Sequence, residues 1–317
     1  MASLKAAGGY QALMNSELAR PYYHNEIIMR GWPEDILPHI TSSQWLEPLT
    51  SCYQTVNVMN QPEVGAWRDL ELNQPLEADT ISPDGFSVRI CWGAYKAIKF
   101  DNHDVRMICE RWDAWEAGFL DSAWNNLSAK WRCYVLDLMV LQADPCNKGC
   151  RAGRDGNVDL GCPGQPRPVN GDTITTELSN LRLVLVTRHR WHNGEMVLIV
   201  PPELQPALVK SDYREVLNMG SCVDCSLLIT GEYPGQLMGF QVFETTDVQS
   251  VPEVGGDRAH YIIAAHRKAM AFVGDIIESR IVEPTEYFGT VYQMAAVWGG
   301  EAIYPDAIAI GYWKFVA

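Results

Sequence analysis

The last third of the chain begins with Gly231-Glu232-Tyr233-Pro234-Gly235-Gln236-Leu237-Met238-Gly239-Phe240-Gln241-Val242-Phe243 and continues with Ala264-Ala265-His266-Arg267-Lys268-Ala269-Met270-Ala271-Phe272. A third segment extends from Tyr287-Phe288-Gly289 through Gly299-Gly300-Glu301-Ala302-Ile303-Tyr304-Pro305-Asp306-Ala307. Glycines and alanines recur beside aromatic residues in these segments. Sheets that pack against a long helix need such small residues wherever backbones approach closely. The segments predict strands, and none of them contains a catalytic motif.

The composition indicates a globular protein with a sizeable core. At 317 residues we expect one large irregular domain or two subdomains. Eleven tryptophans and thirteen tyrosines suit surfaces that are buried against partners as well as cores. The formal charge of -14 argues against a protein that mainly grips phosphates. The longest apolar runs are shorter than the roughly 20 residues of a membrane-spanning helix, so no membrane partner is expected.

The first 100 residues divide into two expected parts. Residues 1–52 lack sustained periodicity and contain proline-bounded pieces, which predicts an arm that packs over something else. Residues 53–100 contain several extended segments, and the sequence Ser82-Pro83-Asp84-Gly85 is a strong turn signal. Such a loop of strands exposes unpaired edges, so a partner subunit is its natural cover. The candidate interface residues here are Trp67, Pro83, Asp84 and Gly85.

Residues 101–144 contain the clearest helix, expected from about Asp104 to Leu141. Asp101, Asn102 or Asp104 would cap its start. Its apolar residues recur at steps of three and four, which places them on one face. They are Val105, Ile108, Trp112, Trp115, Phe119, Ala123, Leu127, Trp131, Tyr134, Leu138 and Leu141.

Residues 145–250 mix loops with short elements. Glycine and proline between residues 142 and 174 predict a loop. Residues 173–189 are expected to pass from helix to strand, and a hairpin-type turn at 191–194 then leads into a buried strand at Met196–Val200. Pro201-Pro202 predicts the start of another short helix, because proline is tolerated in a first helical turn.

Nine cysteines raise the question of a metal site. The weak candidates are Cys146, Cys150, Cys162, Cys222 and Cys225, but no other residues lie at a spacing that completes a standard zinc site. The odd number of cysteines and the lack of an export signal favour a reducing compartment and mostly free thiols. Buried or idle thiols are therefore expected, with no metal and no cofactor.

The sequence gives no support for an enzyme. It contains no H-E-x-x-H, Walker-type, G-x-S-x-G or dinucleotide-binding motif. We expect the ring of His266 to make an ordinary polar contact rather than act as a base. The neighbouring Arg267 and Lys268 could touch nucleic acid, but in so acidic a chain we expect them to pair with an acidic neighbouring subunit.

The order of these segments resembles the major capsid proteins of tailed bacteriophages, the Hong Kong 97 type of coat subunit, over roughly residues 50–312. The resemblance implies an α+β fold with an N-terminal arm, an extended β loop, a long spine helix, an axial domain at 145–250 and a return to the peripheral sheet at 251–317. The residues that carry it are Gly235, Gly239, Phe240, Val242, Ala269, Ala271, Phe272, Gly299, Gly300, Pro305 and Ala307.

The resemblance also implies a function. Such subunits form pentamers and hexamers that close into an icosahedral shell around double-stranded DNA, without recognising its sequence. A separate scaffolding protein, a portal and a cement protein would be further partners, with assembly in the host cytoplasm and the virion capsid as final location. The only lysines in the extended loop are Lys96 and Lys99, near its base, which makes isopeptide cross-linking doubtful.

Two alternatives stay open at this point. A bacterial nanocompartment (encapsulin-like) shell protein would share the fold but need a groove that binds cargo. A zinc- or thiol-dependent cytosolic enzyme would contain stoichiometric metal and form a monomer or small oligomer.

Overall fold

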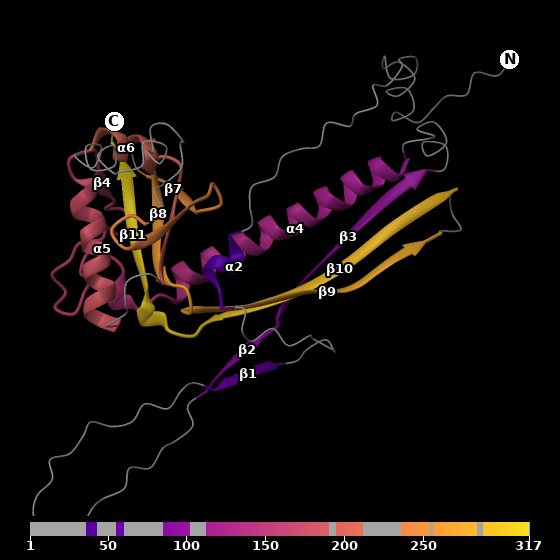
Figure 1. Cartoon of the computed structure of the whole chain (residues 1–317), viewed down its shortest axis with the longest axis horizontal. Helices are drawn as coiled ribbons and strands as arrows, with labels where there is room; N and C mark the ends of the chain where they lie inside the picture. The colour runs from indigo at the N-terminus through magenta and orange to yellow at the C-terminus, as the bar shows by residue number, and fades with distance from the viewer. Residues whose placement is uncertain are drawn as a thin grey trace, which may run out of the picture.

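The computed structural model describes residues 36–42, 55–59, 85–101, 112–189, 195–211, 236–253, 256–283 and 288–316. These residues form two lobes and a small projecting hairpin (Figure 1). The elongated lobe consists of one long helix over a three-stranded sheet. The compact lobe consists of a six-stranded sheet with two shorter helices. In the described chain, no helix is long and apolar enough to cross a membrane.

The elongated lobe is built from α4 (Trp112–Gln142), β3 (Trp92–Asp101), β9 (Met270–Val282) and β10 (Gly289–Ala302). The strands are antiparallel in the order β3-β10-β9. The 31 residues of α4 span about 46 Å at 1.5 Å per residue, and the 14 residues of β10 span nearly the same at about 3.3 Å each. Helix and sheet therefore run alongside each other for most of their length (Figure 1).

The expected spine helix is present, with two differences. Residues 102–111, which include the expected caps Asn102 and Asp104, lie outside the described residues, and Asp101 is the last residue of β3. Leu141 is 74% exposed, although it was expected on the apolar face. Val135, Leu136 and Met139 are buried instead, at 0 to 1% exposure. The C-terminal half of α4 lies where the two lobes meet, so it is buried on more than one side.

The compact lobe contains a sheet in the order β4-β11-β8-β5-β6, with β7 beside β8. Its strands are β4 (Arg167–Val169), β5 (Met196–Val200), β6 (Phe240–Glu244), β7 (Ser250–Pro252), β8 (Arg258–His266) and β11 (Ile308–Phe315), and its helices are α5 (Ile174–His189) and α6 (Leu204–Lys210). Every residue of β5 is buried, as expected for a strand in the centre of a sheet. The short helix expected after Pro201 is confirmed as α6.

The expected helix-to-strand passage at 173–189 is wrong, because α5 is helical throughout. Ile174, Leu178, Leu181 and Leu185 are all buried at 0 to 1% exposure, and their spacing is that of one helix face. The β-branched residues near the end of this segment suggested a strand. Packing against the compact lobe outweighs that local preference, which is weak.

The two lobes exchange strands at two adjacent crossings. The chain passes from β8 to β9 through residues 267–269, and from β10 to β11 through residues 303–307, which include the short 3-10 helix η5 (Pro305–Ala307). Ile303 N and Tyr304 N both donate to Ala269 O, at 2.8 and 3.2 Å. Residues 251–317 therefore contribute β9 and β10 to the elongated lobe and β7, β8 and β11 to the compact lobe.

The projecting hairpin pairs β1 (Thr55–Met59) with β2 (Gly85–Arg89), and Gly85 lies opposite Met59. Residues 60–84, which include Trp67, Pro83 and Asp84, lie outside the described residues. The extended loop is expected to reach residue 100, but β3 (Trp92–Asp101) belongs to the sheet of the elongated lobe. A short helix, α2 (Leu37–Ile40), contacts that sheet nearby, where Ser42 N donates to Met270 O at 2.8 Å.

Candidate subunit interface

An aromatic cluster fixes the three-stranded sheet on α4. Trp131 is 7% exposed, and its ring lies 5.7 Å from Phe272, 5.9 Å from Trp124 and 6.5 Å from Trp298. The charged end of Lys130 lies 5.2 Å from the Trp298 ring, within cation–π distance. This cluster covers one face of the sheet and leaves the opposite face to other contacts.

The strand register separates these two faces. Ala94, Ala296 and Ile276 lie opposite one another and pack against the core beneath α4. The next row turns away from α4, because successive side chains on a strand alternate. In that row Tyr95 and Glu278 lie on either side of Ala295, and Tyr95 is 84% exposed. This outward face therefore presents an aromatic ring with no cover among the described residues.

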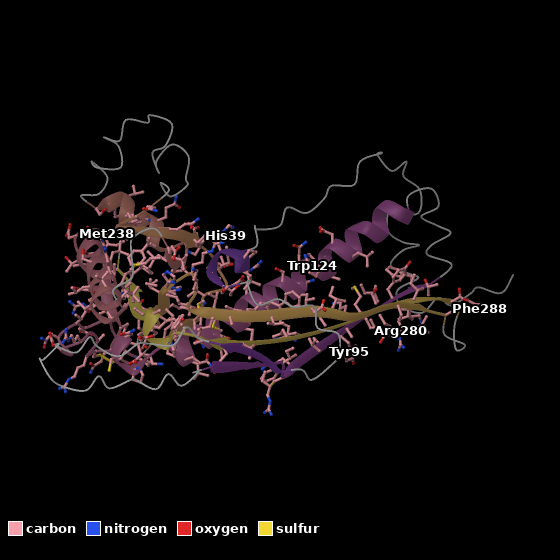
Figure 2. All side chains as sticks on the ribbon, turned by 60° about the horizontal axis from the view of Figure 1, so that its bottom comes forward. His39, Tyr95, Trp124, Met238, Arg280 and Phe288 are labelled. Carbon is pink, nitrogen blue, oxygen red and sulfur yellow. A yellow bond between two sulfur atoms is a disulfide. The ribbon has the colours of Figure 1, made fainter. Side chains whose placement is uncertain are left out.

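Most of the exposed large apolar side chains lie on the elongated lobe. They include Trp92, Tyr95, Leu120, Trp124, Ile281 and Phe288, with exposures between 37% and 88%. Figure 2 shows Tyr95 and Trp124 along the lobe and Phe288 at its far tip. A cavity of about 230 Å³ opens between α4 and the sheet, and most of its lining is apolar. The lining residues are Ala94, Tyr95, Leu120, Ala123, Trp124, Leu127, Ile276, Met294 and Ala296, together with Lys96, Asn126 and Lys130. An exposed apolar surface of this kind is a candidate interaction site.

Strands β3 and β9 are the outer strands of the three-stranded sheet. Among the described residues β3 pairs only with β10, and β9 pairs only with β10 along this sheet. At the start of β9 the outer edge is occupied, because Ser42 N donates to Met270 O. Outer strands are the positions at which another chain can extend a sheet. Lys96 and Lys99 lie on β3 itself, not in the projecting hairpin. The expected doubt about cross-linking through them stays a prediction.

The turn with Arg267 and Lys268 is held by its neighbour His266. The Nδ1 atom of His266 accepts a hydrogen bond from Lys268 N at 3.1 Å, so the proton of the neutral ring is on Nε2. Nε2 lies 2.9 Å from Glu195 Oε2 and donates to that carboxylate. Arg267 N donates to Glu195 O at 3.0 Å. His266 therefore makes the polar contact that was expected, while the Arg267 and Lys268 side chains are exposed and their proposed pairing with a neighbour stays a prediction.

The cysteine candidates do not come together as a metal site in the part of the chain that is described. Cys150 and Cys162 form a disulfide, and Cys146 is free and exposed. No group of three or more His, Cys, Asp or Glu side chains among the described residues could hold a metal ion. The expectation of idle thiols is therefore wrong for Cys150 and Cys162. Cys222 and Cys225 lie outside the described residues.

The glycines that suggested the fold have identifiable roles. Met238 and Gly239 both have positive φ, 52° and 87°, as at the centre of a type I′ turn, and Leu237 and Phe240 exchange two hydrogen bonds across it. A side chain at Gly299 would collide with the backbone of Arg89 and Ile90. The close contact between β10 and the hairpin therefore requires glycine at this position. Gly235 lies outside the described residues.

The other residues of this set lie in or beside the core. Ala269, Ala271 and Ala307 are 0 to 1% exposed, Phe272 is 8% exposed and Phe240 is fully buried. Gly300 follows Gly299 in β10 and pairs with Phe272, and Pro305 begins η5. Val242 lies in β6 at the edge of the compact lobe and packs against its core. Among the described residues, they contribute to packing and turns.

Two charged pairs tie helices to other elements. Arg132 Nε donates to Asp247 Oδ2 at 2.7 Å, which joins α4 to the loop after β6. Arg167 Nε donates to Glu177 Oε1 at 2.8 Å, which joins β4 to α5, and this hydrogen bond raises the pKa of Arg167. Burial raises the pKa of the Asp137 carboxyl on α4. Sequence alone did not single out these pairs, because their partners lie 10 and 115 residues apart.

Comparison with known proteins gives a consistent result for the fold. No protein-family model matches the sequence, and no curated protein matches it. A chain of Mycobacterium phage Che8 is 15% identical and has a TM-score of 0.64, covering 92% of this chain and 96% of that one. The capsid structure of cyanophage P-SCSP1u is 11% identical, with a TM-score of 0.62 and coverage of 94% and 94%. The capsid of Ralstonia phage GP4 is 9% identical, with a TM-score of 0.58 and coverage of 99% and 97%.

These similarities extend over nearly the whole of each chain, so they concern both lobes and their connection. The identities of 9 to 15% are too low to transfer a function residue by residue. They are sufficient to identify the architecture. The chain therefore has the mixed helix-and-sheet fold of phage capsid proteins.

Proposed function

We propose that the chain is a structural major capsid protein of the Hong Kong 97 type, which assembles as pentamers and hexamers into an icosahedral shell around the double-stranded DNA of a tailed phage. The observation that carries this proposal is the coverage of the fold. More than 90% of this chain matches more than 90% of each of the phage chains described above. A shell subunit needs the complete fold, so alignment over nearly the full length of both chains is expected. An enzyme that shared only one domain with a capsid protein would align over only part of the chain.

The elongated lobe supports the proposal on physical grounds. Its outward sheet face, the outer strands of its sheet and its exposed aromatic side chains lie on one thin structure. Contacts with further copies of the chain would cover all three. A patch that meets a different patch on the next copy generates closed rings when the rotation closes, which is the geometry of a capsomer.

The proposed partners follow from this role. The chain binds further copies of itself, and a scaffolding protein, a portal and a cement protein act with it during or after assembly in the host cytoplasm. The formal charge of -14 suits a wall that encloses DNA without adhering to its phosphates. The final location is the virion capsid.

Electron microscopy of the purified chain tests the proposal. The protein is expressed alone and with its neighbouring genes, and negative staining is combined with light scattering after size exclusion. Closed shells or rings of five or six subunits are expected, with nuclease-protected DNA in particles made during infection. A uniform small oligomer under both conditions would contradict a shell role. Particles that hold a cargo enzyme in place of DNA would indicate a nanocompartment.

A pair of variants tests whether the elongated lobe carries the interface. Tyr95→Ser with Phe288→Ser removes two rings that are 84% and 88% exposed, so folding is expected to be unaffected while assembly is reduced. Leu183→Ser is the matched control, because Leu183 is 51% exposed on α5 in the compact lobe. Circular dichroism checks folding and light scattering checks assembly. Equal assembly of both variants would place the interface elsewhere.

A further inference from the structure

A glycine-rich loop at 148–166 lies along the edge of β11 in the compact lobe. The backbone of Lys148 forms a parallel β-bridge with Ile310, and Tyr312 N donates to Leu160 O at 2.8 Å. The loop then continues into β4, which pairs with residues 313–315 of β11. Loop and strand together therefore cover one edge of the central sheet from Ile310 to its end.

The other contacts of the loop with its surroundings are mostly polar: Lys148 Nζ donates to Val140 O and Leu141 O at 3.1 and 3.0 Å, and Gly164 N donates to Glu253 Oε1 at 3.1 Å. Only Ala152 and Leu160 are fully buried apolar residues within it. Its glycines adopt positive φ, a conformation that costs backbone entropy to fix, and they are Gly149, Gly153, Gly156, Gly161 and Gly164. Segments with few buried apolar contacts open most easily from a folded protein. A covalent restraint would therefore reduce how often the loop opens from β11.

The disulfide between Cys150 and Cys162 supplies such a restraint. It joins the start of the loop to the residue that follows Gly161, across a separation of 12 residues. A side chain at Gly161 would collide with the carbonyl oxygen of Tyr312, so this end of the loop touches β11 directly. Both cysteines are only partly buried, so a small thiol or disulfide can reach them.

We propose that Cys150 and Cys162 form a redox-controlled staple that determines how firmly the 148–166 loop is held on β11. The oxidant is a low-molecular-weight disulfide such as oxidised glutathione. One cysteine thiolate attacks it, forms a mixed disulfide and releases one small thiol. The second thiolate attacks the mixed disulfide, forms the Cys150–Cys162 bond and releases a second small thiol. Two protein thiols are oxidised and one small disulfide is reduced to two thiols.

The staple is a property of the folded subunit and does not depend on shell formation. With the bond closed, the loop remains on β11 and shields its edge. With the bond reduced, the loop opens more often and exposes the groups of β11 that it covers. In a reducing compartment the disulfide would be open and the loop would be loosely held. After transfer to oxidising surroundings the disulfide would form and fix the loop on β11.

Trypsin provides a direct test, because Arg151 and Arg154 lie within the loop and are exposed. The purified full chain is equilibrated in glutathione buffers of different ratio, its thiols are trapped by alkylation, and peptide mapping gives the state of Cys150 and Cys162. Cleavage after Arg151 and Arg154 is followed on reducing gels. The reduced chain is expected to be cleaved about 10- to 100-fold faster than the oxidised chain, since cleavage requires the loop to open.

Two variants complete the test. The double variant Cys150→Ser with Cys162→Ser is expected to be cleaved at the fast rate in every buffer. Cys146→Ser, which alters a free and exposed cysteine next to the loop, is expected to behave as the unaltered chain. Cleavage rates that agree within about twofold in oxidised and reduced protein would overturn the proposal. So would Cys150 and Cys162 remaining alkylated thiols in the most oxidising buffer. Neither result would bear on shell assembly, which electron microscopy tests separately.

Discussion

Replacing Trp131 by alanine is expected to weaken the packing of α4 on the three-stranded sheet and to lower the stability of the chain. The ring is 7% exposed and contacts three aromatic rings at 5.7 to 6.5 Å. Truncation of a buried tryptophan or phenylalanine to alanine costs about 3–5 kcal/mol, and each lost aromatic pair adds to the loss of buried area. We expect Trp131→Ala to lower the free energy of unfolding by about 4 kcal/mol.

Two further variants separate burial from ring chemistry. The Nε1 atom of Trp131 is buried without a hydrogen-bond partner. Trp131→Phe removes that unsatisfied donor while keeping a ring, so its net cost should be only about 1 kcal/mol, since an unsatisfied buried donor itself costs about 1–3 kcal/mol. Trp124 lies on the same helix and contacts the same ring but is 48% exposed. Trp124→Ala should therefore cost about 1–2 kcal/mol.

Urea unfolding of the unassembled chain, followed by far-ultraviolet circular dichroism, gives these differences. Circular dichroism is preferred because the substitutions remove fluorophores. The expected order of destabilisation is Trp131→Ala, then Trp124→Ala, then Trp131→Phe. If Trp131→Ala cost less than about 1.5 kcal/mol, or no more than Trp124→Ala, the aromatic cluster would not be what holds the helix on the sheet.

Other predictions concern the backbone, a charged pair and a histidine. Gly299→Ala should cost at least about 2 kcal/mol because the added methyl group meets backbone atoms. Gly118→Ala adds a methyl group within α4 that meets no atom within 4 Å, so it should stabilise the chain by about 0.5–1 kcal/mol. Arg132→Met deprives Asp247 of its guanidinium partner and should cost about 2–3 kcal/mol, less than for a fully buried pair because the Asp247 side chain is 20% exposed. Burial lowers the pKa of His260, so the unfolded chain takes up a proton that the folded chain resists. Stability should therefore fall as the pH drops below about 6.5, and His260→Gln should reduce this dependence. Urea unfolding, at several pH values for the last variant, measures each effect.

The α+β capsid fold was predictable from the order of segments in the sequence, and the structural similarity confirms it. Elements with a strong local pattern were found in place. The long helix shows a repeat over many residues, β5 is a run of apolar residues, and α6 begins just after two prolines. These signals depend only on neighbouring residues, so a single sequence contains them.

Long-range features were not predictable in the same way. Nothing in the spacing of Cys146, Cys150 and Cys162 indicates which two approach each other, because their distance depends on how the glycine-rich loop folds along β11. The buried residues Val135, Leu136 and Met139 were missed because α4 is covered by a second lobe only in its C-terminal half. The exposed rings of Tyr95 and Phe288 look like core residues in a sequence, and only the strand register turns Tyr95 outward.

The candidate interface follows from the dimensions of the elongated lobe. Helix α4 covers one face of the three-stranded sheet, whereas on the opposite face a second buried cluster forms only where Val88 and Ile90 pack against Ala271 and Val273. The helix-facing row, Ala94, Ala296 and Ile276, contributes to the core, while Tyr95 in the outward row is 84% exposed. Lengthening such a lobe adds exposed surface as quickly as core. We therefore propose that further copies of the chain cover the outward row, so removing Tyr95 should weaken assembly while leaving the subunit folded.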